Sequence, residues 1–210
     1  MIDIEKGISL KIEGELGKNQ TLSIDALIKI AESLQALILS IAKYELNKNE
    51  TIDLNNFKLE LNSFTKSSAV PEFVFTKKIQ HTISDYQTQR AQVGNKLNQI
   101  FEISSFGDYS KLSGVFSNSI SQNSIIEDLY VFNNSFNGSP VKIFNSENKD
   151  IFYEPKKFKP AIKKSLIVNI IEPEKQKEEQ EAFASIKITQ KGKQKRTKNI
   201  IADFKDYSFQ

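Results

Sequence analysis

The chain of 210 residues contains no cysteine and a single histidine, His81. Without cysteine it can form no disulfide, offer no thiolate nucleophile and hold no thiolate-bound zinc or iron–sulfur cluster. One histidine leaves too few ligands for a zinc site, and His81 lies off the apolar side of its predicted helix, which indicates a solvent-facing side chain. The sequence therefore predicts no cofactor and is typical of a reducing cytoplasm.

Motifs that bind phosphate or activate a serine are missing as well. The eight glycines form no Gly-x-x-x-x-Gly-Lys-Ser/Thr loop, no Gly-x-Gly-x-x-Gly turn and no Gly-x-Ser-x-Gly elbow. No apolar run approaches the roughly 20 residues that a membrane span needs. The first residues also lack the cationic and apolar regions of a secretion signal. We therefore expect a cytoplasmic protein that makes no contact with a membrane.

The charge is unevenly distributed along the chain. The formal net charge is +3, but residues 1–140 carry 13 Lys and Arg against 16 Asp and Glu, whereas residues 141–210 carry 16 against 10. A basic surplus confined to one part of a chain favours an acidic partner for that part, with solubility as the alternative explanation.

The first 75 residues predict a β-α-β-β unit. Residues 8–16 alternate apolar and polar side chains, which is the period of a half-buried strand. Ser23 is placed as the N-cap of a helix that runs from Ile24 and ends before Asn47. Two more strands are predicted at residues 57–61 and 67–75. Because proline cannot donate to a ladder, the second of them should lie at a sheet edge or begin after Pro71.

Residues 76–104 predict a long helix with a narrow apolar side. Seven side chains, named here the heptad row, follow one another in steps of four and three: Ile79, Ile83, Tyr86, Arg90, Val93, Leu97 and Ile100. So thin a stripe fits either a helix that lies on the sheet of its own chain or an interface with a partner or a second copy. Arg90 discriminates between the two, because a cation is costly in a dry core and tolerable where a partner's acid meets it.

The rest of the chain predicts a second domain. A short helix is expected at residues 124–132, and the breaker Asn137-Gly-Ser-Pro140 divides the chain into an α+β domain, residues 1–138, and a small β-rich domain, residues 139–210. Apolar stretches at 141–144, 150–153, 165–171, 182–188 and 199–204 predict a small antiparallel sheet or partial barrel. The fold class is therefore α+β.

The most basic stretch, residues 190–198, lies between two of these predicted strands. Its cations would lie at the turn of a β-hairpin: Lys191, Lys193, Lys195, Arg196 and Lys198. One interpretation is a solvated turn that protects a sheet edge from unwanted pairing. The other is non-specific, salt-dependent binding of a nucleic-acid backbone, without base stacking, because no aromatic residue interrupts the run.

Several short patterns together resemble an uncharacterised bacterial protein family. They are Ser23-Ile-Asp-Ala-Leu, Leu34-Gln-Ala-Leu, Leu59-Glu-Leu, Ser67-Ser-Ala-Val, and the ending from Ile201 to Phe209. The resemblance covers about a third of the chain and implies no established activity and no functional residue. Separately, Asp150 with Glu154-Pro-Lys156 resembles the Asp…Glu-x-Lys set of restriction-type nucleases, but the proline disrupts the strand that this chemistry needs.

These observations predict a non-catalytic interaction protein. It would be an accessory subunit of a bacterial multi-protein assembly, such as an anti-phage defence or mobile-element system. Its docking surface, to a protein partner or a second copy, would be the 76–103 helix. The alternative is a sequence-nonspecific nucleic-acid-binding protein that uses residues 191–198. An all-carboxylate metal nuclease is the remaining enzymatic interpretation.

Overall fold

A computed structural model describes residues 3–18, 21–46, 52–65, 69–76, 83–145 and 152–169. The chain divides into two compact units, residues 1–170 and 171–210, and every described residue belongs to the first. The strands predicted at 182–188 and 199–204 and the basic stretch at 190–198 lie outside the described residues, as does His81.

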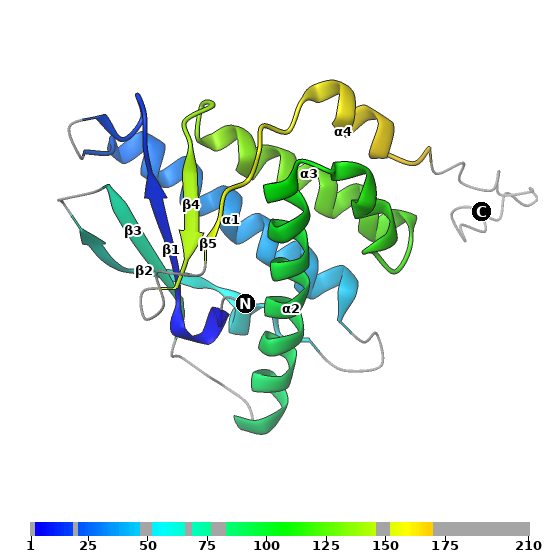
Figure 1. The fold of residues 1–210 in the computed structure, drawn as a ribbon. Helices are drawn as coiled ribbons and strands as arrows, with labels where there is room; N and C mark the ends of the chain where they lie inside the picture. The colour runs from blue at the N-terminus through cyan, green and yellow to red at the C-terminus, as the bar shows by residue number, and fades with distance from the viewer. Residues whose placement is uncertain are drawn as a thin grey trace, which may run out of the picture. The chain divides into compact units, whose positions relative to one another are not determined.

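The described part is built around an antiparallel sheet with helices on one of its faces (Figure 1). The strand order is β2-β3-β1-β4-β5. The strands are β1 Ile8–Ile12, β2 Leu59–Thr65, β3 Val70–Phe75, β4 Val141–Phe144 and β5 Phe152–Tyr153. The α+β class and the strand–helix–strand–strand order of the N-terminal part are confirmed.

The helices are α1 Ile24–Glu45, α2 Ile83–Phe106, α3 Ser119–Ser135 and α4 Pro160–Leu166, with short 3-10 turns η1 Ile4–Lys6, η3 Leu54–Phe57 and η4 Tyr109–Gly114. Both long predicted helices are present, although Thr76, the predicted start of the second, lies outside the helix, and the predicted short helix at 124–132 is the middle of α3. Among the described helices, none combines the length and apolar character needed to cross a bilayer.

Helix α1 begins where the sequence places its cap. Ser23 has extended backbone angles, and its Oγ accepts a hydrogen bond from the amide of Ala26 at 3.2 Å. The apolar stripe of α1 is completely buried at Ile30, Leu34, Leu37, Ile38 and Ile41. Such a stripe packs against the apolar face of a sheet and against neighbouring helices.

Helices α1 and α3 run side by side in opposite directions (Figure 1). The Ser40 hydroxyl on α1 donates to Asp128 on α3, and Glu45 at the end of α1 meets Ser121 at the start of α3. This pair covers the buried side of the sheet, which places the start of α3 beside the end of α1.

Strand β4 extends the N-terminal sheet, so the predicted domain boundary at 138–140 is wrong. It pairs with β1 along its whole length, from Ser9 opposite Phe144 to Ile12 opposite Val141. Residues 141–144 and 152–153 do form the predicted antiparallel pair, but two short strands alone cannot bury an apolar face. Val141 and Ile143 are at most 4% exposed because they join the core that β1 already lines.

Two local predictions fail for identifiable reasons. Pro71 lies within β3, and β3 is an interior strand. The ladder between β3 and β1 pairs Phe73 and Glu72 with Ile8 and Ser9 and does not extend to Pro71, so the missing amide interrupts no pairing there. The strand predicted at 165–171 is wrong over its described residues, because 160–166 form α4 and 167–169 are irregular.

Candidate interaction surface: the lysine strap on α3

The heptad row lies inside the chain. Its described side chains are at most 8% exposed: Tyr86, Arg90, Val93, Leu97 and Ile100. Ile79 and the side chain of Ile83 lie outside what the structure describes. The last three side chains of the row belong to the same core as α1 and the sheet. Of the two interpretations, these contacts favour the helix that packs on its own chain, because buried side chains cannot dock a partner.

Arg90 finds its partners within the chain. Its Nε donates to the carbonyl of Asn56 at 2.7 Å, and its Nη2 donates to the carbonyl of Thr76 at 3.0 Å. Its Nη1 lies 3.2 Å from a carboxylate oxygen of Glu5. The guanidinium also lies over the rings of Phe75 and Tyr86. The acid that was expected from a partner is therefore Glu5 of the same chain, and Arg90 ties α2 to η1, η3 and β3.

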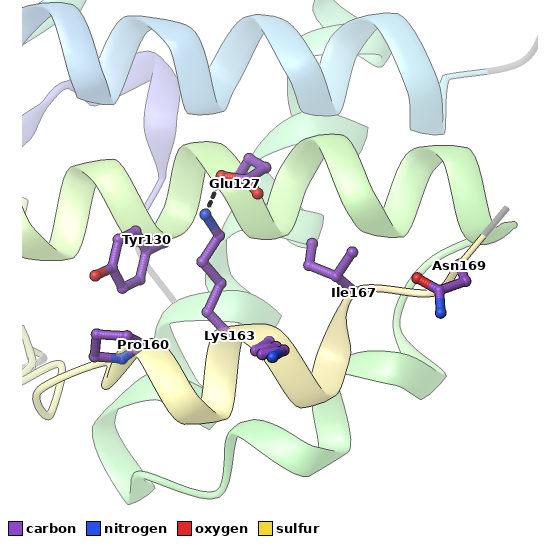
Figure 2. Close-up of a pocket in the computed structure, with 7 residues that line it drawn as sticks. Glu127, Tyr130, Pro160, Lys163, Ile167 and Asn169 are labelled. Carbon is purple, nitrogen blue, oxygen red and sulfur yellow. Dashed lines mark ion pairs between the residues drawn. The ribbon is translucent and has the colours of Figure 1, made fainter.

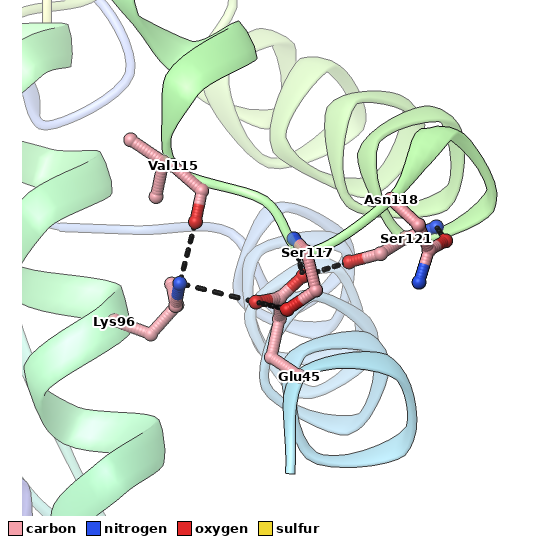
Figure 3. A network of polar contacts seen from close by, with 6 residues as sticks. All are labelled: Glu45, Lys96, Val115, Ser117, Asn118 and Ser121. Carbon is pink, nitrogen blue, oxygen red and sulfur yellow. Dashed lines mark hydrogen bonds and ion pairs between the residues drawn. The ribbon is translucent and has the colours of Figure 1, made fainter. Parts of the chain in front are cut away.

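A second buried charge, Glu45, joins α1 to α2 and to the start of α3 (Figure 3). Its carboxylate accepts hydrogen bonds from the Ser117 amide at 3.0 Å and from the hydroxyls of Ser117 and Ser121, and it lies 3.0 Å from Lys96 Nζ. Burial alone would raise the pKa of Glu45, but the bonds from Ser121, Ser117 and Lys96 outweigh burial and hold the pKa below its ordinary value of 4.5.

The lysine strap is the segment 154–169, which follows β5 and runs over the end of α2, over η4 and along α3 (Figure 1). The Lys156 amide donates to the carbonyl of Ser104 on α2 at 2.9 Å. Gly107, which follows α2, has φ +73, and a Cβ there would lie 3.5 Å from the Lys156 side chain. The strap therefore passes directly over the end of α2.

Aromatic and amide side chains hold the first half of the strap. Asn133 on α3 donates to the carbonyl of Lys156 at 2.9 Å and accepts from the amide of Phe158 at 2.8 Å. The Phe158 ring is fully buried and stacks on the Tyr109 ring at 4.2 Å between centroids. The Tyr109 hydroxyl donates to the same Lys156 carbonyl, and burial raises its pKa to about 12, although a hydrogen bond with Ser104 lowers it.

The second half of the strap is held by the side-chain amides of two consecutive residues of α3. Gln122 donates to the carbonyl of Leu166 at 2.5 Å. Asn123 donates to the carbonyl of Val168 and accepts from its amide, both at 2.8 Å. Like Asn133, Asn123 therefore uses its side chain to bond both a backbone carbonyl and a backbone amide of the strap, as the backbone of a neighbouring strand would. These bonds fix the path of the strap on α3 at both ends.

The strap presents a row of cations to solvent. Within the part of the chain that the structure describes, four of its lysines are exposed and form no ion pair: Lys156, Lys157, Lys159 and Lys164. Its only acid, Glu154, lies 3.3 Å from Lys142 Nζ and is thereby neutralised. The fifth lysine, Lys163, pairs with Glu127 and lies 4.8 Å from the centroid of the Tyr130 ring.

An open groove of about 450 Å³ lies between α3 and α4, beside the strap lysines (Figure 2). Its lining includes Tyr130, Pro160 and Ile167, with the ion pair between Glu127 and Lys163 across it. That pair leaves Lys164 as the uncompensated charge of the groove. The groove therefore continues the positive surface of the strap and does not oppose it.

The remaining site predictions have different outcomes. Lys191, Lys193, Lys195, Arg196 and Lys198 lie outside the described residues. So does Asp150 of the nuclease-like set, whereas Glu154 binds Lys142 as described. Among the described residues, no three acidic, histidine or cysteine side chains gather closely enough to hold a metal ion.

The signal that could have identified the strap is its own sequence. Residues 154–164 read Glu-Pro-Lys-Lys-Phe-Lys-Pro-Ala-Ile-Lys-Lys, with two prolines and five lysines. Composition of this kind indicates an exposed connection, and the single Phe158 among the lysines was the hint that the segment is anchored. No protein-family model, no curated protein and no solved structure matches the chain.

Proposed function

We propose that this chain is a non-catalytic interaction protein, a cytoplasmic accessory subunit of a bacterial multi-protein assembly, and that the lysine strap holds a polyanionic partner. The observation that supports the proposal is the row of Lys156, Lys157, Lys159 and Lys164 on a backbone fixed by side chains of α3 and η4. Exposed cations without ion pairs keep their full attraction for an incoming anion, because no local acid has to be displaced.

The fixed backbone makes this row more effective than the same lysines on a free segment. A free segment would lose about 1–2 kcal/mol of backbone entropy per residue when a partner orders it. The strap has already lost that freedom on folding, since Asn123 and Asn133 hold its two ends. Only the lysine side chains remain to be ordered by the partner.

The magnitudes indicate a modest, salt-sensitive attachment. An exposed ion pair contributes about 0–1 kcal/mol, so four such contacts supply at most about 4 kcal/mol. Screening acts over about 8 Å at physiological salt, and charges at a rim mainly raise the association rate. A contribution of this size suits a subunit that is retained in an assembly by more than one contact.

The interior charges support the non-catalytic part of the proposal. Arg90 and Glu45 each form three hydrogen bonds within the chain, and each is used to join helices to the rest of the fold. Their partners are backbone carbonyls, serines and one opposite charge apiece. This use of buried charge gives structural specificity.

Heparin chromatography of the full chain tests the proposal. The strap variant replaces Lys156, Lys157, Lys159 and Lys164 with glutamine. The control variant replaces four exposed lysines elsewhere, Lys18, Lys29, Lys43 and Lys58, and so has the same net charge. We expect the strap variant to elute at clearly lower salt than the wild type, and the control variant to elute close to the wild type. Elution of the two variants together would refute the proposal.

A further inference from the structure

An exposed aromatic ring is found at the end of α2, where the strap crosses that helix. Phe106, the last residue of α2, is 79% exposed, the largest exposed fraction among the large apolar side chains of the described residues. The strap crosses α2 two residues before it, through the bond from the Lys156 amide to Ser104. Gly107, one residue after it, approaches the Lys156 side chain. Phe106 therefore lies in the chain between Ser104 and Gly107, the two residues at which Lys156 approaches the end of α2.

The charge around Phe106 leaves the ring accessible to an anion. Asp108, two residues further on, is engaged by Lys111 at 2.9 Å and by the Ser110 hydroxyl at 2.7 Å. Glu102, one helical turn before Phe106, is the exposed acid of this region. Glu102 would repel an anion that Lys156 and Lys157 attract.

We propose, on the basis of the proposed function, that the polyanion held by the lysine strap is a single-stranded nucleic acid, with one base stacked on Phe106. Single strands are bound where cations follow the backbone and an aromatic ring receives an unstacked base. A duplex keeps its bases within the stack, and an acidic protein needs only the cations. An exposed ring at the point where the lysine strap crosses α2 therefore fits a single strand better than either of the other polyanions.

The test measures fluorescence anisotropy of a labelled oligothymidylate of about 15 nucleotides, long enough for the site sizes of single-strand binders. Phe106→Ala should weaken binding at least about fivefold, the lower end for loss of one stacked base. Phe106→Trp should restore binding, and Ile24→Ala, which trims another apolar side chain that is 75% exposed, should leave it unchanged. Glu102→Gln should strengthen binding, since it removes the opposing acid.

Heparin retention separates this inference from the proposed function. Phe106→Ala should retain the wild-type elution from heparin, because heparin has no bases to stack. Suppose that Phe106→Ala binds oligothymidylate as the wild type does, while the strap variant still elutes from heparin at lower salt than the wild type. The nucleic-acid inference is then refuted and the proposed function stands. If the strap variant and its control elute together, both are refuted. Thermal unfolding of each variant establishes that it is folded.

Discussion

Replacement of Arg90 tests whether the heptad row is core or interface. In the structure the Arg90 side chain is 4% exposed and donates to two backbone carbonyls, those of Asn56 and Thr76. Asn56 and Thr76 are themselves buried. Arg90→Ala would therefore remove one donor from each of the two carbonyls and open a cavity beside Phe75 and Tyr86.

The expected cost follows from these contacts. A hydrogen bond from a charged donor contributes about 1.5–3 kcal/mol, and an unsatisfied buried carbonyl costs about 1–3 kcal/mol. Water that enters the cavity of the alanine variant can donate hydrogen bonds to the two carbonyls and so reduce this cost. We therefore expect Arg90→Ala to lower the free energy of unfolding by about 3–5 kcal/mol, the usual range for removing one partner of a buried pair. Arg90→Met should lose somewhat less, because it restores the volume without the bonds.

Urea denaturation followed by far-UV circular dichroism measures this loss, and the absence of tryptophan makes circular dichroism the direct probe of unfolding. Glu5→Gln is the matched control. The Glu5 side chain is 37% exposed, so its ion pair should contribute only about 0–1 kcal/mol. A loss below about 0.5 kcal/mol in Arg90→Ala, the level of an ordinary surface substitution, would refute the placement of Arg90 in the core.

Three further predictions concern Glu45, Tyr109 and Asn133. Glu45→Gln should lose about 2–3 kcal/mol at neutral pH in urea denaturation; because the folded pKa is lowered, this contribution should disappear as pH falls below 4.5. The folded pKa of Tyr109 is raised, so wild-type stability should fall as pH rises from 10.0 to about 12, and Tyr109→Phe should reduce that fall. Part of the fall should remain, because burial also raises the pKa of Tyr153. Asn133→Ala should speed hydrogen exchange of the Phe158 amide about fivefold, as expected for one lost bond of about 1 kcal/mol; unchanged exchange would contradict the anchoring.

Local patterns predicted the elements whose causes are local. The Ser23 cap and the strand around Leu10 depend on neighbouring residues, and the structure contains both features. The strand ends at Ile12, and Ser9 is buried along with its apolar neighbours, so β1 is not the half-buried strand of 8–16 that the alternation predicted. The heptad row predicted the helix correctly but not the surface against which the helix packs. That surface depended on Arg90, whose acceptors lie 34 and 14 residues away at Asn56 and Thr76. No periodicity within α2 contains that information.

The errors came from signals that have two physical meanings. Asn137-Gly-Ser-Pro140 marks a turn, and such a turn can connect two elements of one domain as readily as it can separate two domains. The pairing of β4 with β1 shows that it connects elements of one domain. A short apolar run such as 165–171 suits a strand or a buried helix end. The contacts of Gln122 and Asn123 with this run, at separations of 44 and 45 residues, determined its actual path.

The salt dependence of oligothymidylate binding tests the lysine strap most directly. Each phosphate contact on a single strand changes the slope of log affinity against log salt by about 0.7, so loss of all four strap lysines should reduce its magnitude by up to about 3. The control variant lacking Lys18, Lys29, Lys43 and Lys58 should retain the wild-type slope. Equal slopes for the two variants, with the slope lost only when Lys191, Lys193, Lys195, Arg196 and Lys198 are neutralised, would contradict the account.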